Sequence, residues 1–110
     1  MLIDFEGMDP KDAYHILTQT VIPRPVAWVL SENPDGDYNL APFSFFTPIT
    51  SNPPLLMISV GKKPAEGVSK DTRVNIEARK NFVVHIAHRD LAAAVTESSR
   101  TLPHGESELK

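Results

Sequence analysis

Residues 22–47 read Ile22-Pro-Arg-Pro-Val-Ala-Trp-Val-Leu-Ser31, then Glu-Asn-Pro-Asp-Gly-Asp37, then Tyr38-Asn-Leu-Ala-Pro-Phe-Ser-Phe-Phe-Thr47. Two apolar, strand-like runs flank a tight turn in this stretch. Asn33-Pro-Asp-Gly36 is typical of such a turn, because proline presets φ and glycine tolerates a positive φ. The stretch therefore predicts a hairpin between residues 26–31 and 38–47.

The second run is unusual for a strand because it contains Pro42. Proline cannot donate to a ladder, so we expect strand pairing to break there and to leave backbone groups for other partners. The same run combines polar side chains with phenylalanine rings, which suits a planar heteroaromatic ligand held at its edge by amides. An edge strand with a bulge and core phenylalanines explains the same composition. The polar residues are Asn39, Ser44 and Thr47, and the rings are Phe43, Phe45 and Phe46.

Outward from the hairpin, the patterns predict helices at residues 9–20, 70–80 and 91–98 and strands at 55–60 and 82–87. Asp9 and Asp90 are the expected caps of the first and last helices. Because the first three strands are neighbours in sequence, we expect an antiparallel meander. So few strands do not close a barrel and would leave open sheet edges, so a partner subunit or a longer domain is expected to cover them.

The composition is that of a small globular protein. A length of 110 residues predicts a single domain over residues 1–110. The net charge of −3, without a basic tract, argues against a nucleic-acid interface. The lack of cysteine excludes disulfides, thiol catalysis and iron–sulfur ligation. No apolar run is long enough to span a membrane, and the early Asp4 and Glu6 do not fit a signal peptide, so a cytoplasmic location is expected.

A second candidate segment is Ser69-Lys-Asp-Thr72, at the start of the helix expected over residues 70–80. Free N–H groups at a helix start favour anions, and the charge of Lys70 and the hydroxyl of Thr72 would add to a phosphate site. Alternatively, Asp71 caps the helix and Lys70 is solvated. Arg24, held between two prolines, suits a phosphate or a carboxylate, or is a surface arginine.

Other kinds of site have little support. His85 and His88 stand at the end of one expected strand without a third ligand, so no metal site is expected. Ser98 and Ser99 have no arranged base beside them, and no dinucleotide-binding or Walker pattern occurs.

In family order and at family-like spacing, these segments resemble the flavin reductase-like family, whose members have the FMN-binding split-barrel fold. The resemblance is closest to its flavoredoxin-type and nitrilotriacetate monooxygenase component B-type branch, and it covers nearly all of residues 9–105. The matching segments are Val21-Ile-Pro-Arg-Pro-Val-Ala-Trp-Val29, Gly36, Asn39-Leu-Ala-Pro-Phe-Ser-Phe-Phe46, Ser51-Asn-Pro-Pro-Leu55, Lys70-Asp-Thr72, Asn75-Ile76 and Phe82-Val-Val84.

The resemblance implies a mainly β fold with some α structure: a split β-barrel of mostly antiparallel strands with peripheral helices, incomplete in this chain. It also implies a homodimer that binds FMN near the subunit interface. The ring system would be lined by Asn39, Ala41, Pro42, Phe43 and Ser44, and the wall would continue through Phe45, Phe46 and Thr47. Lys70 and Thr72 would lie near the phosphate, Asp71 and Asn75 would order that helix start, and Arg24 stands in the matching Pro-Arg-Pro segment.

The chain departs from the family in two respects. His85 stands where members usually carry asparagine, which puts any side-chain role there in question. Family domains are close to twice as long, and residues 102–108 resemble the linker before their further strands, so the chain is expected to be the N-terminal part of such a domain.

The leading functional hypothesis is an oxidoreductase that passes a hydride from NADH or NADPH to FMN and supplies reduced flavin to a partner monooxygenase or another acceptor. An FMN-binding electron carrier of the flavoredoxin kind is the second hypothesis. An inactive fragment or a small interaction domain is the third.

Overall fold

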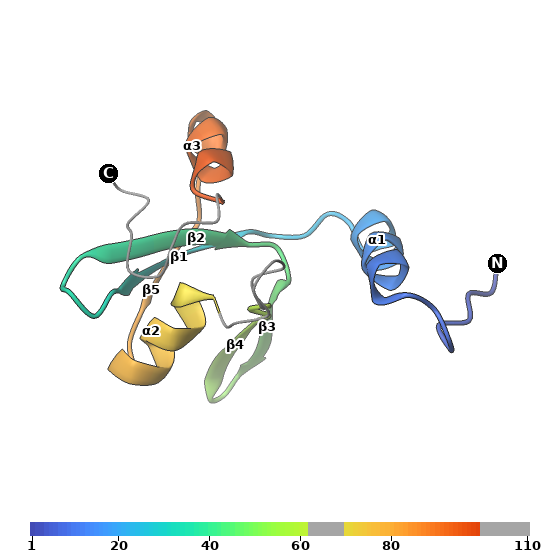
Figure 1. Cartoon of the computed structure of the whole chain (residues 1–110), viewed down its shortest axis with the longest axis horizontal. Coiled ribbons are helices and arrows are strands. Elements are labelled where there is room, and N and C mark those ends of the chain that lie inside the picture. Colours follow the sequence, from blue (N-terminus) through green and yellow to red (C-terminus); the bar gives the residue numbers. More distant parts are fainter. Residues whose placement is uncertain (62–69, 100–110) are drawn as a thin grey trace.

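The computed structural model describes residues 1–61 and 70–99. Most of the expected loop at 61–67, Ser69 and the linker-like residues 102–108 lie outside this part. Figure 1 shows mainly β structure with helices at its periphery. The elements in chain order are α1 Pro10–Thr20, β1 Ala27–Glu32, β2 Tyr38–Phe43, β3 Phe46–Ser51, β4 Pro54–Ile58, α2 Asp71–Arg79, β5 Val83–His85, a 3-10 turn Arg89–Leu91 and α3 Ala92–Glu97.

Within the described residues, the strands form two antiparallel sheets that do not pair with each other. One has the order β2-β1-β5 and the other pairs β3 with β4. The hairpin expected from residues 22–47 is confirmed, with Ala27 opposite Phe43 and Glu32 opposite Tyr38. Its turn is closed by a hydrogen bond from the Gly36 N–H to the Asn33 carbonyl at 3.1 Å, and Gly36 has the positive φ of 86° that such a turn requires.

The expected antiparallel meander is wrong. Residues 38–47 do not form one strand, because β2 ends at Phe43 and β3 begins at Phe46 in the other sheet. The break also lies elsewhere than expected. Pro42 stays within the ladder, opposite Trp28, and the chain leaves the sheet at residues 44–45. Pro42 is tolerated because β2 is the edge strand of its sheet, where one side of the backbone needs no ladder donor.

Of the two expected helix caps, one is confirmed and one is wrong, and the alternative in which Asp71 caps α2 is not observed. The Asp9 side chain accepts a hydrogen bond from the Lys11 N–H at 2.9 Å, so the cap of α1 is confirmed. Asp90 instead lies inside the 3-10 turn that precedes α3. The first residue before α2 is Lys70, in an extended conformation and without a side-chain capping bond, so Asp71 is the first helical residue rather than the cap.

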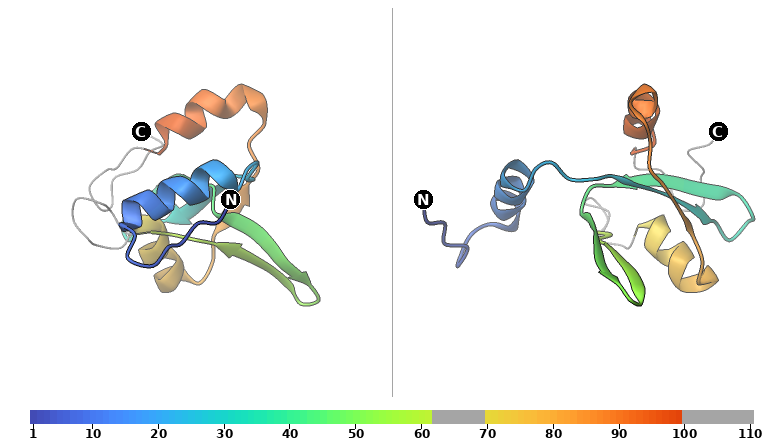
Figure 2. Two further views of the ribbon diagram at one scale, coloured as in Figure 1. Left: turned by 90° about the vertical axis from the view of Figure 1, so that its right-hand side faces the viewer. Right: turned by 180° about the vertical axis from the view of Figure 1, so that it is seen from behind.

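Strand register separates two faces of the three-stranded sheet. One face carries Ala27 and Val29 with their partners Phe43, Ala41 and Val84, and it packs against α2 and the β3–β4 hairpin. Figure 1 and the reverse view in Figure 2 show α2 and this hairpin on one side of the sheet and α3 on the other. On that other face the Trp28 indole N–H donates to the Ser98 hydroxyl at 2.9 Å and ties down the end of α3.

The hydrophobic core is small. Among the described residues, the buried apolar side chains are Ala27, Val29 and Phe43. Half-buried apolar side chains pack around them, from both sheets and from α2. These are Ala41, Phe46, Ile58, Val60, Ile76 and Val84.

Helix α1 stands apart from the sheets, at the end of an extended segment (Figures 1 and 2). No residue of this described helix is buried. The radius of gyration, 15.4 Å, exceeds the roughly 13 Å of a compact domain of this length, which agrees with a projecting helix. Within the described residues, no helix combines the length and the apolar character needed to cross a membrane.

Candidate functional site

Arg24 joins the end of α1 to the segment that follows β2. Its Nη1 donates to the carbonyl oxygens of Thr18 at 2.8 Å and Val21 at 2.7 Å, and its Nε lies 3.4 Å from the Ser44 hydroxyl oxygen. The guanidinium carbon also lies 5.6 Å from the centre of the Phe45 ring. Because the carbonyl end of a helix carries partial negative charge, this cation stabilises the end of α1 while it holds residues 44–45 in place.

A cavity of about 370 Å³ opens beside Arg24. That volume lies within the range of small-molecule sites. Its walls are largely apolar, with a guanidinium and two hydroxyl groups among them. Five of the predicted site residues meet here: Arg24, Ser44, Phe45, Phe46 and Thr47. Sequence reasoning missed the other lining residues, which are Leu17, Val21, Pro23, Pro25 and Met57.

Sequence reasoning also missed an aromatic contact that extends this cluster onto α1. Tyr14 stacks on Phe45, with ring centres 6.0 Å apart and planes 25° from parallel. Tyr14 lies three residues before Leu17, so both side chains lie on the same side of α1. This spacing is the sequence signal that indicates a contact surface on the helix. The helix that stands apart from the sheets therefore forms one wall of the site.

A second group of predicted residues lies where β2 meets the start of α2. The Asn39 side-chain amide donates to the Thr72 hydroxyl at 2.9 Å, and both residues are buried. The Lys70 ammonium lies 5.5 Å from the centre of the Phe43 ring. Asp71 is buried beside them. Phe43 thus connects the two groups, since it touches Lys70 and is followed directly by Ser44.

Asn75 forms a third group, away from the cavity. Its buried side-chain amide donates to the Ser31 hydroxyl at 3.1 Å and to the Asn33 side-chain oxygen at 2.9 Å. Arg79 adds a bond to the Asn33 carbonyl at 3.0 Å. These contacts fasten the middle and end of α2 to the turn between β1 and β2. The predicted role of Asn75 near a cofactor stays a prediction. The observed hydrogen bonds of its side chain go to other residues of the protein.

The register also divides the predicted residues of β2. Asn39, Ala41 and Phe43 lie on the face toward α2, whereas Pro42 lies with Trp28 on the opposite face. Side chains on both faces cannot pack against one side of a flat ring. A ligand that meets both Ala41 and Pro42 therefore has to approach the backbone at the edge of the sheet.

Metal ligands do not gather in the part of the chain that the structure describes, where no group of three His, Asp or Glu side chains is placed to hold an ion. His85 lies in β5 opposite Trp28, on the face that carries α3. It is therefore remote from the face that holds Asn39 and Phe43.

The Asn39–Thr72 bond provides a test of how β2 positions α2. Thr72→Val keeps the shape but removes the oxygen that accepts from the buried Asn39 amide, so we expect a loss of about 1 to 3 kcal/mol in unfolding free energy. Urea denaturation measures this loss. Thr96→Val is the control, because the Thr96 hydroxyl is exposed and bonds within α3. Equal losses in both variants would show that the buried bond has no special weight.

Residues 19–110 match the family model for the flavin reductase like domain. An uncharacterized protein of Halalkalibacterium halodurans is 41% identical over 110 residues, which cover 100% of this chain and 52% of that protein. The chain spans about half the length of the curated relatives that it matches.

Solved structures also match this chain over about half of their own length. Nitrilotriacetate monooxygenase component B from Bacillus cereus has a TM-score of 0.89 at 41% identity, covering 99% of this chain and 53% of that one. 2-Nitrobenzoate 2-nitroreductase NbaA from Pseudomonas fluorescens has a TM-score of 0.84 at 32% identity, covering 98% of this chain and 50% of that one. A protein with a split barrel domain from Shewanella frigidimarina has a TM-score of 0.74 at 16% identity, covering 99% of this chain and 54% of that one. At this identity the likeness shows the fold alone. The expected split-barrel fold is confirmed.

Proposed function

Because this chain belongs to the family of flavin reductase-like domains, we propose that it binds FMN and contributes to a flavin reductase-type oxidoreduction. The observation that carries the proposal is the cavity beside Arg24. There, aromatic and apolar walls meet a cation and two hydroxyl groups, and five predicted flavin-binding residues gather.

The residues present fit FMN by their chemistry. Phe45 and Phe46 offer flat surfaces to a ring system, and Ser44 and Thr47 offer hydroxyl groups along the ribityl chain. The backbone of residues 39–44, including Ala41 and Pro42, would meet the polar edge of the ring from the edge of the sheet. Lys70 and Thr72, ordered by Asp71, would hold the phosphate, because an anion is favoured at the start of α2.

The chemistry itself would come from the cofactor: bound FMN accepts a hydride and passes electrons on. NADH or NADPH is the proposed hydride donor, and a partner oxygenase is the proposed acceptor. The names of two similar proteins support an oxidoreductase role, since one is a component of a monooxygenase and the other is a nitroreductase. The protein's own part is to bind, orient and shield the flavin. We also propose a homodimer with the flavin near its interface.

The first test is binding of FMN to the full chain, followed by desalting and measurement of visible flavin absorbance. Rapid loss of NADH or NADPH absorbance in the presence of FMN would then support the reductase. Retained flavin that only a protein donor reduces would favour an electron carrier instead. A colourless protein after incubation with saturating FMN would overturn the flavin proposal itself.

Arg24→Ala is expected to weaken FMN binding about tenfold or more, because it removes a cation from the cavity wall together with its contacts to Ser44 and Phe45. Arg73→Ala is the matched control. Arg73 lies exposed on α2 and is paired with Glu77 at 2.9 Å. Fluorescence titration of FMN measures both affinities. Similar affinities for the two variants would remove Arg24 from the proposed site.

A further inference from the structure

The ring of Phe45 is held from outside the two sheets. Its backbone is fixed near the end of β4, because the Ser59 N–H donates to the Phe45 carbonyl oxygen at 2.9 Å. Among the described residues, the half-buried Phe45 ring is not packed on the core cluster, whereas the neighbouring Phe46 is. The ring instead meets Tyr14, with ring centres 6.0 Å apart, and the Arg24 guanidinium carbon at 5.6 Å. Its direction therefore depends on α1 and on the segment that follows α1.

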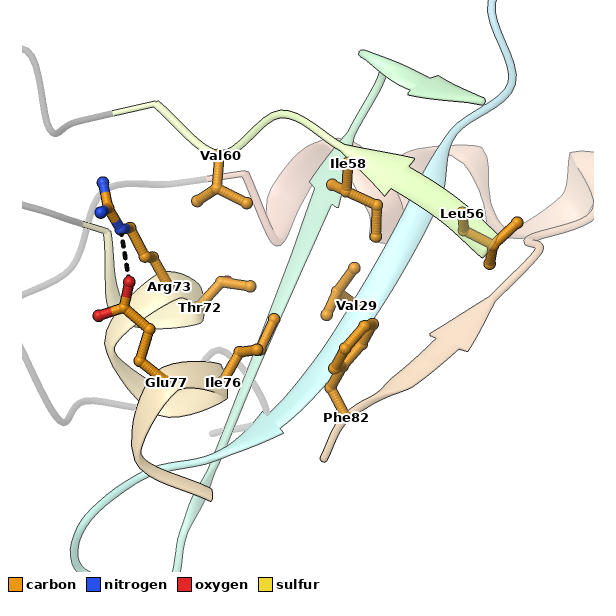
Figure 3. A pocket seen from close by; sticks show the side chains of 9 residues that line it. All are labelled: Val29, Leu56, Ile58, Val60, Thr72, Arg73, Ile76, Glu77 and Phe82. Carbon is orange, nitrogen blue, oxygen red and sulfur yellow. Dashed lines mark hydrogen bonds and ion pairs between the residues drawn. The ribbon is translucent and has the colours of Figure 1, made fainter. Parts of the chain in front are cut away.

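Another wall of the cavity beside Arg24 is fixed by strand pairing. Thr47 and Met57 both line this wall and stand opposite each other in the β3–β4 ladder. Met57 lines this cavity, whereas its neighbours Leu56 and Ile58 line a second cavity of about 420 Å³ between β4 and α2 (Figure 3). The two cavities share no lining residue. The strand wall is thus set by the backbone, whereas the aromatic wall is set by side-chain contacts.

The stack of Tyr14 on Phe45 contributes little to the packing of the sheets. Helix α1 has no buried residue, and Tyr14 itself is 56% exposed. A ring that is already held in its binding orientation loses less conformational freedom when a ligand arrives, so the ligand binds more tightly. The effect of this stack on ligand affinity can therefore be measured apart from any effect on folding.

We propose that Tyr14 is a positioning residue for the flavin ring, which holds Phe45 in the orientation that receives the isoalloxazine. This inference rests on the proposed binding of FMN. Tyr14 is not among the residues that line the cavity, so it acts through Phe45. Because Phe45 serves the ring system, the loss of Tyr14 lowers affinity whether or not the ligand carries a phosphate. Riboflavin, which has the ring and the ribityl chain of FMN without the phosphate, is therefore the second probe.

In the full chain, Tyr14→Ala is expected to weaken the binding of FMN and of riboflavin by the same factor, about three- to tenfold. Alanine preserves the helix propensity of α1. Tyr14→Phe keeps the stacked ring and is expected to restore both affinities to within about twofold. Fluorescence titration of each flavin measures these affinities.

Tyr38→Ala is the matched control. Tyr38 is the other tyrosine of the chain, is 43% exposed, and stands at the start of β2 outside the cavity. Its replacement is expected to change either affinity by less than about twofold. Circular dichroism establishes that the variants fold. Tyr14→Leu, which keeps apolar bulk without an aromatic face, takes the place of Tyr14→Ala should that variant unfold.

A double-mutant cycle tests whether Tyr14 acts through Phe45. Phe45→Leu removes the ring on which Tyr14 stacks. In that background, Tyr14→Ala is expected to lower the affinity for FMN by less than about twofold further, because the two side chains act as one unit.

Four results would overturn the proposal. A wild-type chain that binds neither flavin removes the proposed function and this role together. If the wild type binds FMN and Tyr14→Ala binds both flavins equally well, the proposed function stands and the role of Tyr14 falls. A loss confined to FMN assigns Tyr14 to the phosphate end. An undiminished loss in the Phe45→Leu background shows that Tyr14 does not act through Phe45.

Discussion

Phe43→Ala is expected to lower the free energy of unfolding by about 3 to 5 kcal/mol, the largest effect among the substitutions considered. Phe43 is 6% exposed and is the bulkiest of the described apolar residues that are buried. It packs beside Ala27 and Val29, and its ring also lies under Lys70. A core this small has few other side chains that could repack into the cavity left by alanine. The lost packing would therefore reduce the free energy of unfolding without compensation.

Urea denaturation without added flavin measures this effect apart from any role in FMN binding. Phe82→Ala is the control, because Phe82 is as large but lies beside the cavity between β4 and α2, where 43% of it is exposed. We expect it to cost less than half as much. If the two variants lose the same stability, the core does not centre on Phe43.

Asn75→Ala is expected to cost about 2 to 4 kcal/mol, because it removes two hydrogen bonds at once. The Asn33 side-chain oxygen would lose its donor inside the protein, where Asn33 is 0% exposed. The turn between β1 and β2 would then be held to α2 by Arg79 alone among these three bonds. Thermal denaturation followed by circular dichroism measures the change.

Asn81→Ala is the control for this substitution, since Asn81 is an exposed asparagine just beyond α2. The same pair also separates two roles of Asn75. If Asn75 acts through the fold, the FMN affinity of folded Asn75→Ala protein will match that of the wild type. A lower affinity without a stability loss would instead assign Asn75 a direct contact with the cofactor.

The sequence was most informative where a local rule acts alone. Asn33-Pro-Asp-Gly36 closes its turn through Gly36, Asp9 caps α1, and the resemblance to flavin reductase-like domains is confirmed by the family match. These features depend on turn chemistry, on capping and on an ordered set of motifs, each of which can be read from consecutive residues.

Sequence reasoning failed where long-range packing decides. Residues 38–47 look continuous, but the chain changes sheets after Phe43, and no local signal indicates that step. The break expected at Pro42 does not occur there, because an edge strand tolerates proline within its ladder. The partners of Asn75 are residues 31 and 33, more than forty positions away, so its buried hydrogen bonds could not be anticipated.

Helix α1 has a thermodynamic consequence of its own. An isolated helix of 11 residues is marginal in water, and α1 has no buried residue to hold it. Its order depends on the Asp9 cap at one end, on the stacking of Tyr14 on Phe45, and on Arg24 at the other end, where the carbonyls of Thr18 and Val21 accept hydrogen bonds. We therefore expect α1 to unfold separately from the sheets, and its amide hydrogens to exchange with solvent well before those of β1. A ligand bound in the cavity beside Arg24 would stabilise α1 and slow the exchange of its amide hydrogens.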